Sequence, residues 1–330
     1  MAVIDENGVK RRLRIMLGSE HLAEEYIKKY GYRIDANNLK LLRSVSEEVA
    51  EIEAPKESSA DDPIFTVFLK CPSCLMGNIP SYELKAKSLQ ILTDKFGMPH
   101  YRASGKYQVL DYNLLSVTVC PKCLYASPDK KDFIGRDPAR AQEIPARMHQ
   151  GELAAMLALA DERIHWLAQQ KLDAMKDLIP RSRTPAAGLA SYDLAIKRAE
   201  IEFSRNVPFS AYKMAAYYLK QATIAEAYEV NPLVYHVKAL RSYLTCFERS
   251  NAPGFNFEGQ VLYLVIALAL KVNKLEIAGS YIGVLEQSKS RADAGLFDPG
   301  VVSQFKRWYT AAREVWADRE DPDLWVMRKS

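Results

Sequence analysis

The sequence lacks the short motifs that mark the common enzyme classes. HExxH, GxSxG, GxGxxG and GxxxxGK are all missing. These patterns are typical of zinc proteases, serine hydrolases, dinucleotide-binding folds and P-loop nucleotide hydrolases. The five histidines are scattered along the chain, so they form no local ligand set either. We therefore expect a protein that is not an enzyme.

Long apolar runs are absent as well. The longest run, from Val261 to Leu270, is about half of what a helix needs to cross a bilayer. The first residues, MAVIDENGVKRRLR, do not contain the apolar core of a secretory signal. Cysteine thiolates in CxxC pairs also suit a reducing compartment. The sequence thus predicts a cytoplasmic protein with no membrane span.

A strong charge of either sign is missing too. Lysine and arginine number 45 against 41 aspartates and glutamates, so the formal net charge is only +4. Such a balance does not by itself indicate binding to nucleic acid. The 330 residues are 48% hydrophobic and 26% charged, which is ordinary for a globular protein. This length is enough for two or three domains.

Cysteine is scarce, and its placement is the most informative feature of the sequence. Four of the five cysteines form two CxxC pairs, Cys71 with Cys74 and Cys120 with Cys123. A CxxC pair places two thiolates at the separation that one tetrahedral zinc ion needs, and two pairs complete its four ligands. The sequence therefore predicts one Zn²⁺ per chain. Because a catalytic zinc ion keeps one position open for water, this closed set indicates a structural role.

Two other interpretations of the cysteines compete with a metal site. In the first interpretation, the thiols are unrelated or joined in disulfides. In the second, one CxxC pair is a thioredoxin-like redox pair. A second CxxC pair favours the metal over both, since a redox pair does not need one. Leu75 and Leu124 follow the pairs where zinc knuckles usually have glycine, so we expect strained turns with φ > 0 there. His100 lies between the pairs and is expected at the surface.

Changes of composition along the chain predict its organisation. Two polar stretches that contain proline, PKESSADDP and PRSRTPAAG, are interpreted as linkers. We expect a mainly α protein with a small zinc-ribbon-like β module and a C-terminal tetratricopeptide-like helical array. The predicted segments are an N-terminal helical segment at 1–54, a linker at 55–63, the zinc-binding β module at 64–135, a long connecting helix at 137–179, a linker at 180–188, the helical domain at 189–317 and a tail at 318–330.

The β module is predicted from the alternation of apolar residues before each cysteine pair. The segments 65–69 and 115–119 both alternate in this way, which is typical of strands. The insert between the pairs interleaves tyrosines with basic residues. Such an insert either binds a single-stranded nucleic acid by stacking on its bases or forms an ordinary solvent-exposed surface of a small β module. We favour the second interpretation. Its basic residues are Lys85, Lys87, Lys95, Arg102 and Lys106.

The helical part is predicted from three- and four-residue spacings. An apolar stripe over 153–167 favours the long connecting helix, bent near Pro145 and Gly151. Small and apolar residues at 261–272 and 275–289 predict two closely crossing helices, like a tetratricopeptide hairpin. Arrays of such hairpins expose a concave groove. Further helices are expected at 189–205, 209–230, 233–249 and after Pro299.

These features together resemble a bacterial family, that of domain of unknown function 2225. The resemblance rests on four stretches between residues 64 and about 290: FLKCPSC, DYNLLSVTVCPKCLYAS, LASYDLAIKRAEIEFSR and FSAYKMAAYYLKQATIAEAYE. It implies a zinc-ribbon-like module followed by tetratricopeptide-like helices, and it implies no activity. The family's knuckles typically read CPxCG, from which Leu75 and Leu124 depart. The first sixty residues are not covered.

Two functions agree with these observations. The first is a zinc-stapled interaction or scaffold protein, which binds a peptide or helix of a partner in the helical groove. The eighteen tyrosines favour it, because tyrosine is enriched in binding surfaces. The alternative is a nucleic-acid-binding zinc ribbon that uses the basic insert with Lys122, Lys130, Lys131 and Arg136. Replacing Cys71 or Cys120 by serine is expected to release zinc and disorder 64–135, while the helices after 189 survive on a separate core.

Overall fold

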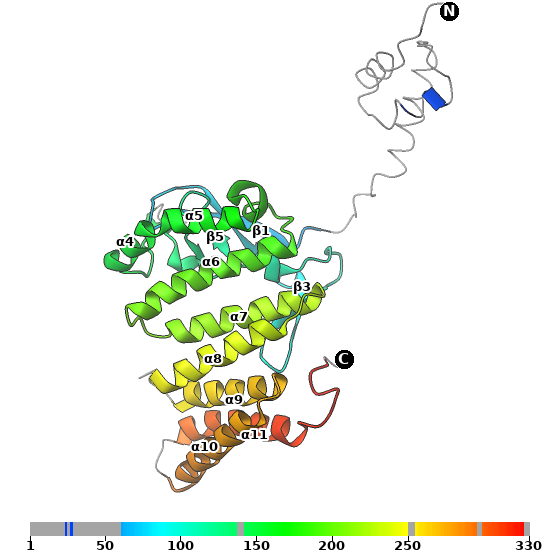
Figure 1. Ribbon diagram of the computed structural model, residues 1–330, viewed down its shortest axis with the longest axis vertical. Coiled ribbons are helices and arrows are strands. Elements are labelled where there is room, and N and C mark those ends of the chain that lie inside the picture. Colours follow the sequence, from blue (N-terminus) through cyan, green and yellow to red (C-terminus); the bar gives the residue numbers. More distant parts are fainter. Residues whose placement is uncertain are drawn as a thin grey trace, which may run out of the picture. The chain divides into compact units, whose positions relative to one another are not determined.

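The described part of the chain begins with short strands and ends with helices. The computed structural model describes residues 61–136, 142–249, 255–295 and 299–326, together with Glu24, Ile27 and Lys28. Residues from Asp62 onward belong to one unit, in which the first strands lie at one end and the helices follow (Figure 1). Apart from Glu24, Ile27 and Lys28, which are helical, the predicted N-terminal helical segment lies outside the described residues, as does most of the first linker.

Within the described residues, the strands form four small antiparallel pairs. In the first pair, β1 runs beside β2 with Ile64 opposite Leu84, and Leu69 at its end leads directly into Cys71. The predicted strand at 65–69 is therefore present. The predicted strand at 115–119 is reduced to its last two residues, because a 3₁₀ turn, Tyr112–Leu114, precedes it. The strands are β1 Ile64–Leu69, β2 Ile79–Leu84, β3 Leu89–Thr93, β4 Pro99–Ala103, β5 Thr118–Val119, β6 Ala126–Ser127, β7 Gly135–Arg136 and β8 Glu143–Ile144.

Over the described residues 142–179, the predicted long helix is replaced by several shorter elements. The chain stays extended at β8 and then forms α4, Gln150–Ala158, and α5, Ala160–Gln169, followed by a π-helical turn, Ala174–Leu178. Leu159 departs from helical geometry between α4 and α5. The break has a tertiary cause, because α4 packs Leu153 and Met156 against the cysteine turns. A periodic stripe alone does not reveal such a break.

The remaining helices stack one beside the next in a curved array (Figure 1). The first of them begins at Pro185, inside the predicted linker, because the Thr184 hydroxyl accepts a hydrogen bond from the Ala187 N–H and caps the helix. Gly188 lets this helix approach the 3₁₀ turn Tyr112–Leu114, since a Cβ there would lie 2.6 Å from Leu114 Cδ2. The helices are α6 Pro185–Ser204, α7 Ser210–Ala227, α8 Leu233–Arg249, α9 Phe255–Lys271, α10 Leu275–Asp293 and α11 Pro299–Ala317.

The longest apolar run of the sequence forms the middle of α9. Every residue from Val261 to Ala269 is buried, because α8, α10 and α11 all pack around this helix. A helix that is apolar on all sides belongs in a core or in a membrane. Among the described residues, no helix combines the length and the apolar character that a membrane crossing needs.

The strands and the helices share one core. Val117, Val119 and Leu124, next to the second cysteine pair, belong to the same buried cluster as residues of α6, α7 and α9. Buried Arg183, just before α6, adds polar contacts, since its Nη1 donates to the carbonyl oxygens of Leu114 and Val117 at 3.2 and 2.8 Å. The expectation that the helices after 189 rest on a separate core is therefore wrong.

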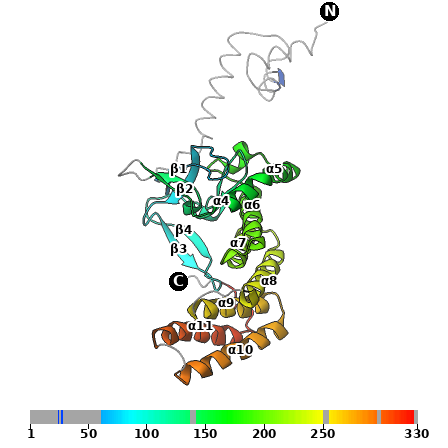
Figure 2. The ribbon, with the colours of Figure 1, turned by 90° about the vertical axis from the view of Figure 1, so that its left-hand side faces the viewer.

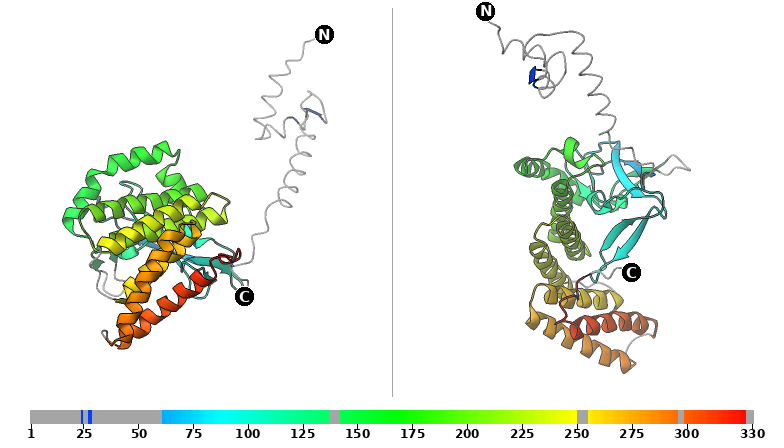
Figure 3. Two further views of the ribbon diagram at one scale, coloured as in Figure 1. Left: turned by 60° about the horizontal axis from the view of Figure 1, so that its bottom comes forward. Right: turned by 90° about the vertical axis from the view of Figure 1, so that its right-hand side faces the viewer.

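The hairpin β3–β4 runs from the strands to the far helices on the inner side of the curve (Figures 2 and 3). At its tip, Phe96 lies between His236 of α8 and Trp325, with ring centroids 5.5 and 5.2 Å away. The Tyr263 hydroxyl of α9 donates to the carbonyl oxygen of Lys95. The predicted tail thus docks at Trp325, and the hairpin occupies part of the side where an open groove was expected.

Candidate metal centre

The two cysteine pairs lie on turns with the same hydrogen bonds. In the first turn, the Cys71 N–H donates to Met76 O at 2.8 Å and the Leu75 N–H donates to Cys71 O at 3.1 Å. In the second, the Cys120 N–H donates to Tyr125 O and the Leu124 N–H donates to Cys120 O, at 2.8 and 2.9 Å. Each turn directs its two sulfur atoms inward, so the turns act as two equivalent halves of one site.

The leucine after each pair adopts the left-handed conformation, as the sequence predicts. Leu75 has φ 61° and Leu124 has φ 56°, a region where a residue with a Cβ is strained. The two leucines differ in burial, since Leu75 is 62% exposed and Leu124 is 1% exposed. Packing therefore explains the leucine in the second turn but not in the first.

This difference makes a matched pair of glycine substitutions informative. Leu75→Gly relieves about 1–2 kcal/mol of strain from the left-handed backbone conformation. The greater flexibility of glycine in the unfolded chain offsets about 0.5–1 kcal/mol of this gain. This substitution is expected to raise the free energy of unfolding slightly. Leu124→Gly removes a buried side chain and is expected to lower that free energy by about 2–5 kcal/mol. Urea unfolding measures both, and equal effects of the two changes would contradict this explanation.

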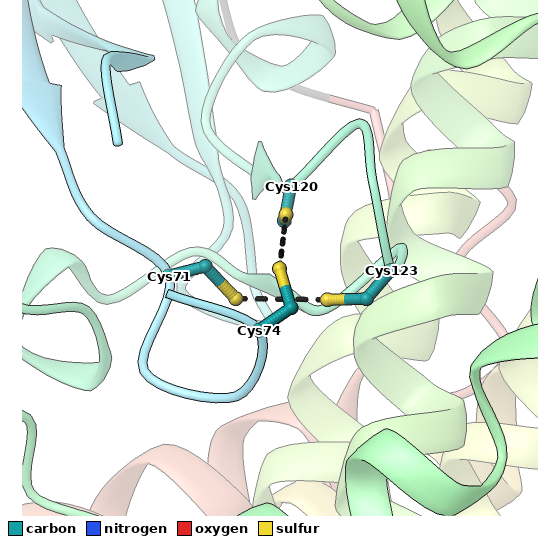
Figure 4. Close-up of side chains that lie close together, drawn as sticks. All are labelled: Cys71, Cys74, Cys120 and Cys123. Atoms are coloured by element: carbon teal, nitrogen blue, oxygen red, sulfur yellow. Dashed lines mark hydrogen bonds between the residues drawn. The ribbon is translucent and has the colours of Figure 1, made fainter. Parts of the chain in front are cut away.

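The four sulfur atoms converge from the two turns (Figure 4). Cys71 Sγ lies 3.6 Å from Cys123 Sγ, and Cys74 Sγ lies 3.5 Å from Cys120 Sγ. All four atoms lie within 4.8 Å of one another. Disulfides require about 2.05 Å, so all four cysteines are free thiols. A tetrahedral zinc site with bonds of about 2.3 Å needs sulfur atoms about 3.8 Å apart, which this arrangement fits.

The cluster also shows the electrostatics of a cation site. Hydrogen bonds with Cys120 and Cys123, together with burial, raise the pKa of Cys71 far above its usual range. Hydrogen bonds from Cys120 and Cys71 lower the pKa of Cys123, so the thiolate is favoured at Cys123, whereas the raised pKa values of Cys71 and Cys120 favour their protonated forms. Four thiolates this close repel one another, and a dication removes that repulsion as it displaces the protons. Metal affinity is therefore expected to fall as the pH is lowered.

Arg163 of α5 is a further residue of the centre, and the sequence analysis missed it. Its side chain is 4% exposed, and its Nη2 donates to Cys123 O at 2.8 Å and to Met156 O at 2.7 Å. Its Nε also donates to Cys123 O, at 3.2 Å. Burial lowers the pKa of Arg163, and the sulfurs of Cys123 and Cys71 oppose that change. Four thiolates around a dication carry net negative charge, which a buried guanidinium offsets.

Replacing Arg163 tests this role. Arg163→Met keeps the length of the side chain but removes the charge and the donors to Cys123. Residues that orient metal ligands typically change metal affinity by about 10–100-fold. We expect a loss of that size in competition with a chelator, with the metal-to-protein ratio unchanged at saturation. Arg181→Met, at an exposed arginine paired with Asp62, is the control. An unchanged affinity in Arg163→Met would contradict the role.

Other residues that the sequence singled out lie away from the cluster. His100 Nε2 lies 3.4 Å from Asp94 Oδ2 in the β3–β4 hairpin. Two lysines of the basic set are engaged within the protein. Lys130 forms an ion pair with Glu83, and Lys85 donates to the carbonyl oxygen of Asp62 at 2.8 Å. The structure thus brings together the four cysteines and none of the histidines that it describes.

A buried ion network lies behind the second turn, and the sequence analysis missed it too. Arg198 of α6 is 2% exposed, and its Nη1 lies 2.6 Å from Asp132 Oδ2. Its Nε lies 3.0 Å from Glu202 Oε1, and Lys213 of α7 lies 2.7 Å from Glu202 Oε2. Tyr125, which accepts the Cys120 N–H, donates its hydroxyl to Asp132 O at 2.9 Å. The spacing of Arg198 and Glu202 on the alanine-rich face of α6 was the available signal.

A cavity of about 490 Å³ opens beside this network. One wall comes from Asp129 and Asp132 of the β module and from the start of α4, and the other comes from the corner between α6 and α7. Asp132 and Glu202 line it, so the network forms part of its floor. Since the cavity lies between the module and the helices, it joins the two parts that share the core.

Comparison with known proteins gives one match. A family model described as "Uncharacterized protein conserved in bacteria (DUF2225)" matches residues 65–312. The match covers both cysteine pairs and every helix from α4 to α10. No curated protein and no solved structure matches the chain.

Proposed function

The chain belongs to this bacterial family, and from its site we propose that it binds one structural zinc ion and serves as a non-enzymatic scaffold for a protein partner. The observation that carries the proposal is the closed set of four sulfur atoms. Two turns that are distant in sequence supply every ligand that tetrahedral zinc takes, which leaves no position for a substrate. The ion would then hold the two turns of the β module together, and this module shares its core with the helical array.

The surface for the partner follows from what the structure leaves exposed. The hairpin β3–β4 occupies part of the inner side of the array, so a peptide has less room there than the sequence predicts. The turn between α7 and α8 instead exposes four large apolar side chains within seven residues: Tyr228, Val230, Leu233 and Val234. Apolar groups gathered in this way support a protein-binding surface. We place the contact with a partner peptide or helix on this turn.

The nucleic-acid alternative has less support. Lys130 forms an ion pair with Glu83, which reduces the free positive charge of the module, and Lys85 is held by a backbone carbonyl oxygen. Binding to nucleic acid weakens steeply with salt, so a mobility shift of mixed oligonucleotides that disappears at high salt would favour the alternative. The absence of a shift at low salt would leave the scaffold as the better explanation.

Two measurements test the proposal. Elemental analysis of freshly purified chain is expected to give about one zinc per chain. Cross-linking and affinity purification from cells that produce the protein are expected to recover a stoichiometric partner, and Leu233→Ser with Val234→Ser is expected to lose it. Leu157→Ser on α4, a similarly exposed leucine, is the matched control. A chain without zinc, or a partner retained by the double variant, would overturn the corresponding half of the proposal.

A further inference from the structure

The four cysteine side chains of the metal centre differ in their access to solvent. Cys74 is half-buried, and the other three cysteines of the cluster are buried. Leu75 and Asn78, which follow Cys74 in the first turn, are exposed. In the second turn, Leu124 and Tyr125 are buried in the protein. A small solute therefore reaches the cluster most easily at the Cys74 sulfur.

Each sulfur atom of one turn faces a sulfur atom of the other (Figure 4). Cys74 Sγ lies 3.5 Å from Cys120 Sγ, and Cys71 Sγ lies 3.6 Å from Cys123 Sγ. The sulfur atoms of a disulfide lie about 2.05 Å apart, so Cys74 and Cys120 need to approach by only about 1.5 Å to form one. An accessible cysteine with a second thiol beside it is the arrangement typical of redox-sensitive cysteines.

We propose that Cys74 is a site of oxidation by hydroperoxides and that the product is a disulfide between Cys74 and Cys120, across the two turns. In the first step, the Cys74 sulfur attacks the O–O bond, takes up one oxygen as a sulfenic acid and releases an alcohol or water. In the second step, the Cys120 sulfur displaces that oxygen as water, and the S–S bond forms. The two sulfurs lose two electrons, which reduce the hydroperoxide. The protons come from the two thiols, or from solvent where a metal ion holds the thiolates.

This disulfide would replace one link between the turns by another. It uses two of the four sulfur atoms that a tetrahedral ion needs, so the ion is released. The covalent link still joins the turns, so Val119 and Leu124 keep their places in the core that they share with α6. Oxidation would thus remove the metal without disordering the module. The loss of metal rests on the proposed zinc site, whereas the pairing of Cys74 with Cys120 does not.

The test treats the zinc-loaded full chain with less than one equivalent of hydrogen peroxide. A coloured chelator measures the free zinc, and alkylation, trypsin and mass spectrometry map the cysteines. Trypsin cleaves after Lys122, so Cys120 and Cys123 fall in separate peptides, 107–122 and 123–130, while the first pair stays in peptide 71–85. The expected product joins peptide 71–85, through Cys74, to peptide 107–122. About one zinc ion is expected to be released for each disulfide.

Cys246→Ser is the matched control, because Cys246 is buried on α8 and lies outside the cluster. This variant is expected to give the same linked peptides and the same release of zinc. Hydrogen exchange is expected to show α6 protected in the oxidised chain and unprotected in a reduced chain whose zinc a chelator has removed.

Three results would overturn the inference. They are a first disulfide that lies within peptide 71–85 or involves Cys123, zinc that stays bound after the peroxide is consumed, and equal exchange of α6 in the two treated chains. A chain that holds no zinc but forms the disulfide between Cys74 and Cys120 would support the oxidation site and overturn the proposed metal site.

Discussion

Cys71→Ser is expected to release the metal and to destabilise α6 together with the β module. Metal binding in zinc peptides contributes about 10–16 kcal/mol to folding, which is comparable to the whole stability of a typical domain. Val117, Val119 and Leu124 pack into the core of the helices, so disorder of the cysteine turns uncovers that core as well. Hydrogen exchange is expected to rise across 64–136 and in α6, and to rise least in α10.

Cys246→Ser provides the control for this experiment. Cys246 is also a buried thiol, 2% exposed, but it lies on α8 away from the four-sulfur cluster. Its replacement is expected to leave the metal content unchanged. It is expected to lower the free energy of unfolding only by the loss of local packing around residue 246. If α6 keeps its full protection in Cys71→Ser, the module and the helices unfold independently and the shared core has no energetic consequence.

Arg198→Met is expected to lower the free energy of unfolding by about 3–5 kcal/mol at pH 7, because it leaves Asp132 and Glu202 buried without their guanidinium. Arg313→Met is the matched control. Arg313 pairs with Glu286 at 2.6 Å, but both side chains are about half exposed. An exposed pair contributes about 0–1 kcal/mol, so this variant is expected to unfold almost as wild type does. Urea unfolding of both variants gives the comparison.

The pH dependence of Arg198→Met distinguishes lost charge from lost packing. In wild type, burial raises the pKa of Asp132, but Arg198 and the Ser127 hydroxyl outweigh it, so the pKa of this carboxyl is lowered. Its contribution to stability is present above the unfolded pKa and is lost as the pH falls through the folded pKa. Without Arg198 burial dominates, and the pKa of Asp132 rises above its ordinary value.

The variant's folded state then takes up a proton more readily than its unfolded state. The free energy of unfolding of the variant is lower than that of wild type at pH 7. This difference is therefore expected to narrow as the pH falls from 7 towards 4, where Asp132 becomes neutral. A difference that stays constant over this range would show that the variant suffers only from altered packing.

The sequence was sufficient for the features that depend on local spacing. The CxxC pairs identified Cys71, Cys74, Cys120 and Cys123, which the structure brings together. The periodicity after residue 189 predicted the helices that form the array, and the description as a mainly α chain with small sheets is confirmed. Both results follow because a tight turn and an amphipathic helix are each specified within a few neighbouring residues.

The features that sequence reasoning missed depend on contacts between distant residues. Arg163 reaches Cys123 across 40 positions, and Arg198 reaches Asp132 across 66. The break between α4 and α5 depends on packing against the cysteine turns, and an apolar stripe continues through it unchanged. The shared core likewise could not be read from composition, because strands and helices that pack together carry the same apolar residues as those that pack apart.

The docking of Phe96 against Trp325 has a consequence for the order in which the chain is made. A ribosome completes the β3–β4 hairpin well before it reaches Trp325, with a delay of roughly 10–50 s at usual rates of synthesis. Throughout that interval the aromatic tip of the hairpin has no C-terminal partner. A nascent chain therefore presents an apolar tip that a chaperone can bind, and an early stop codon before Trp325 would make that transient exposure permanent.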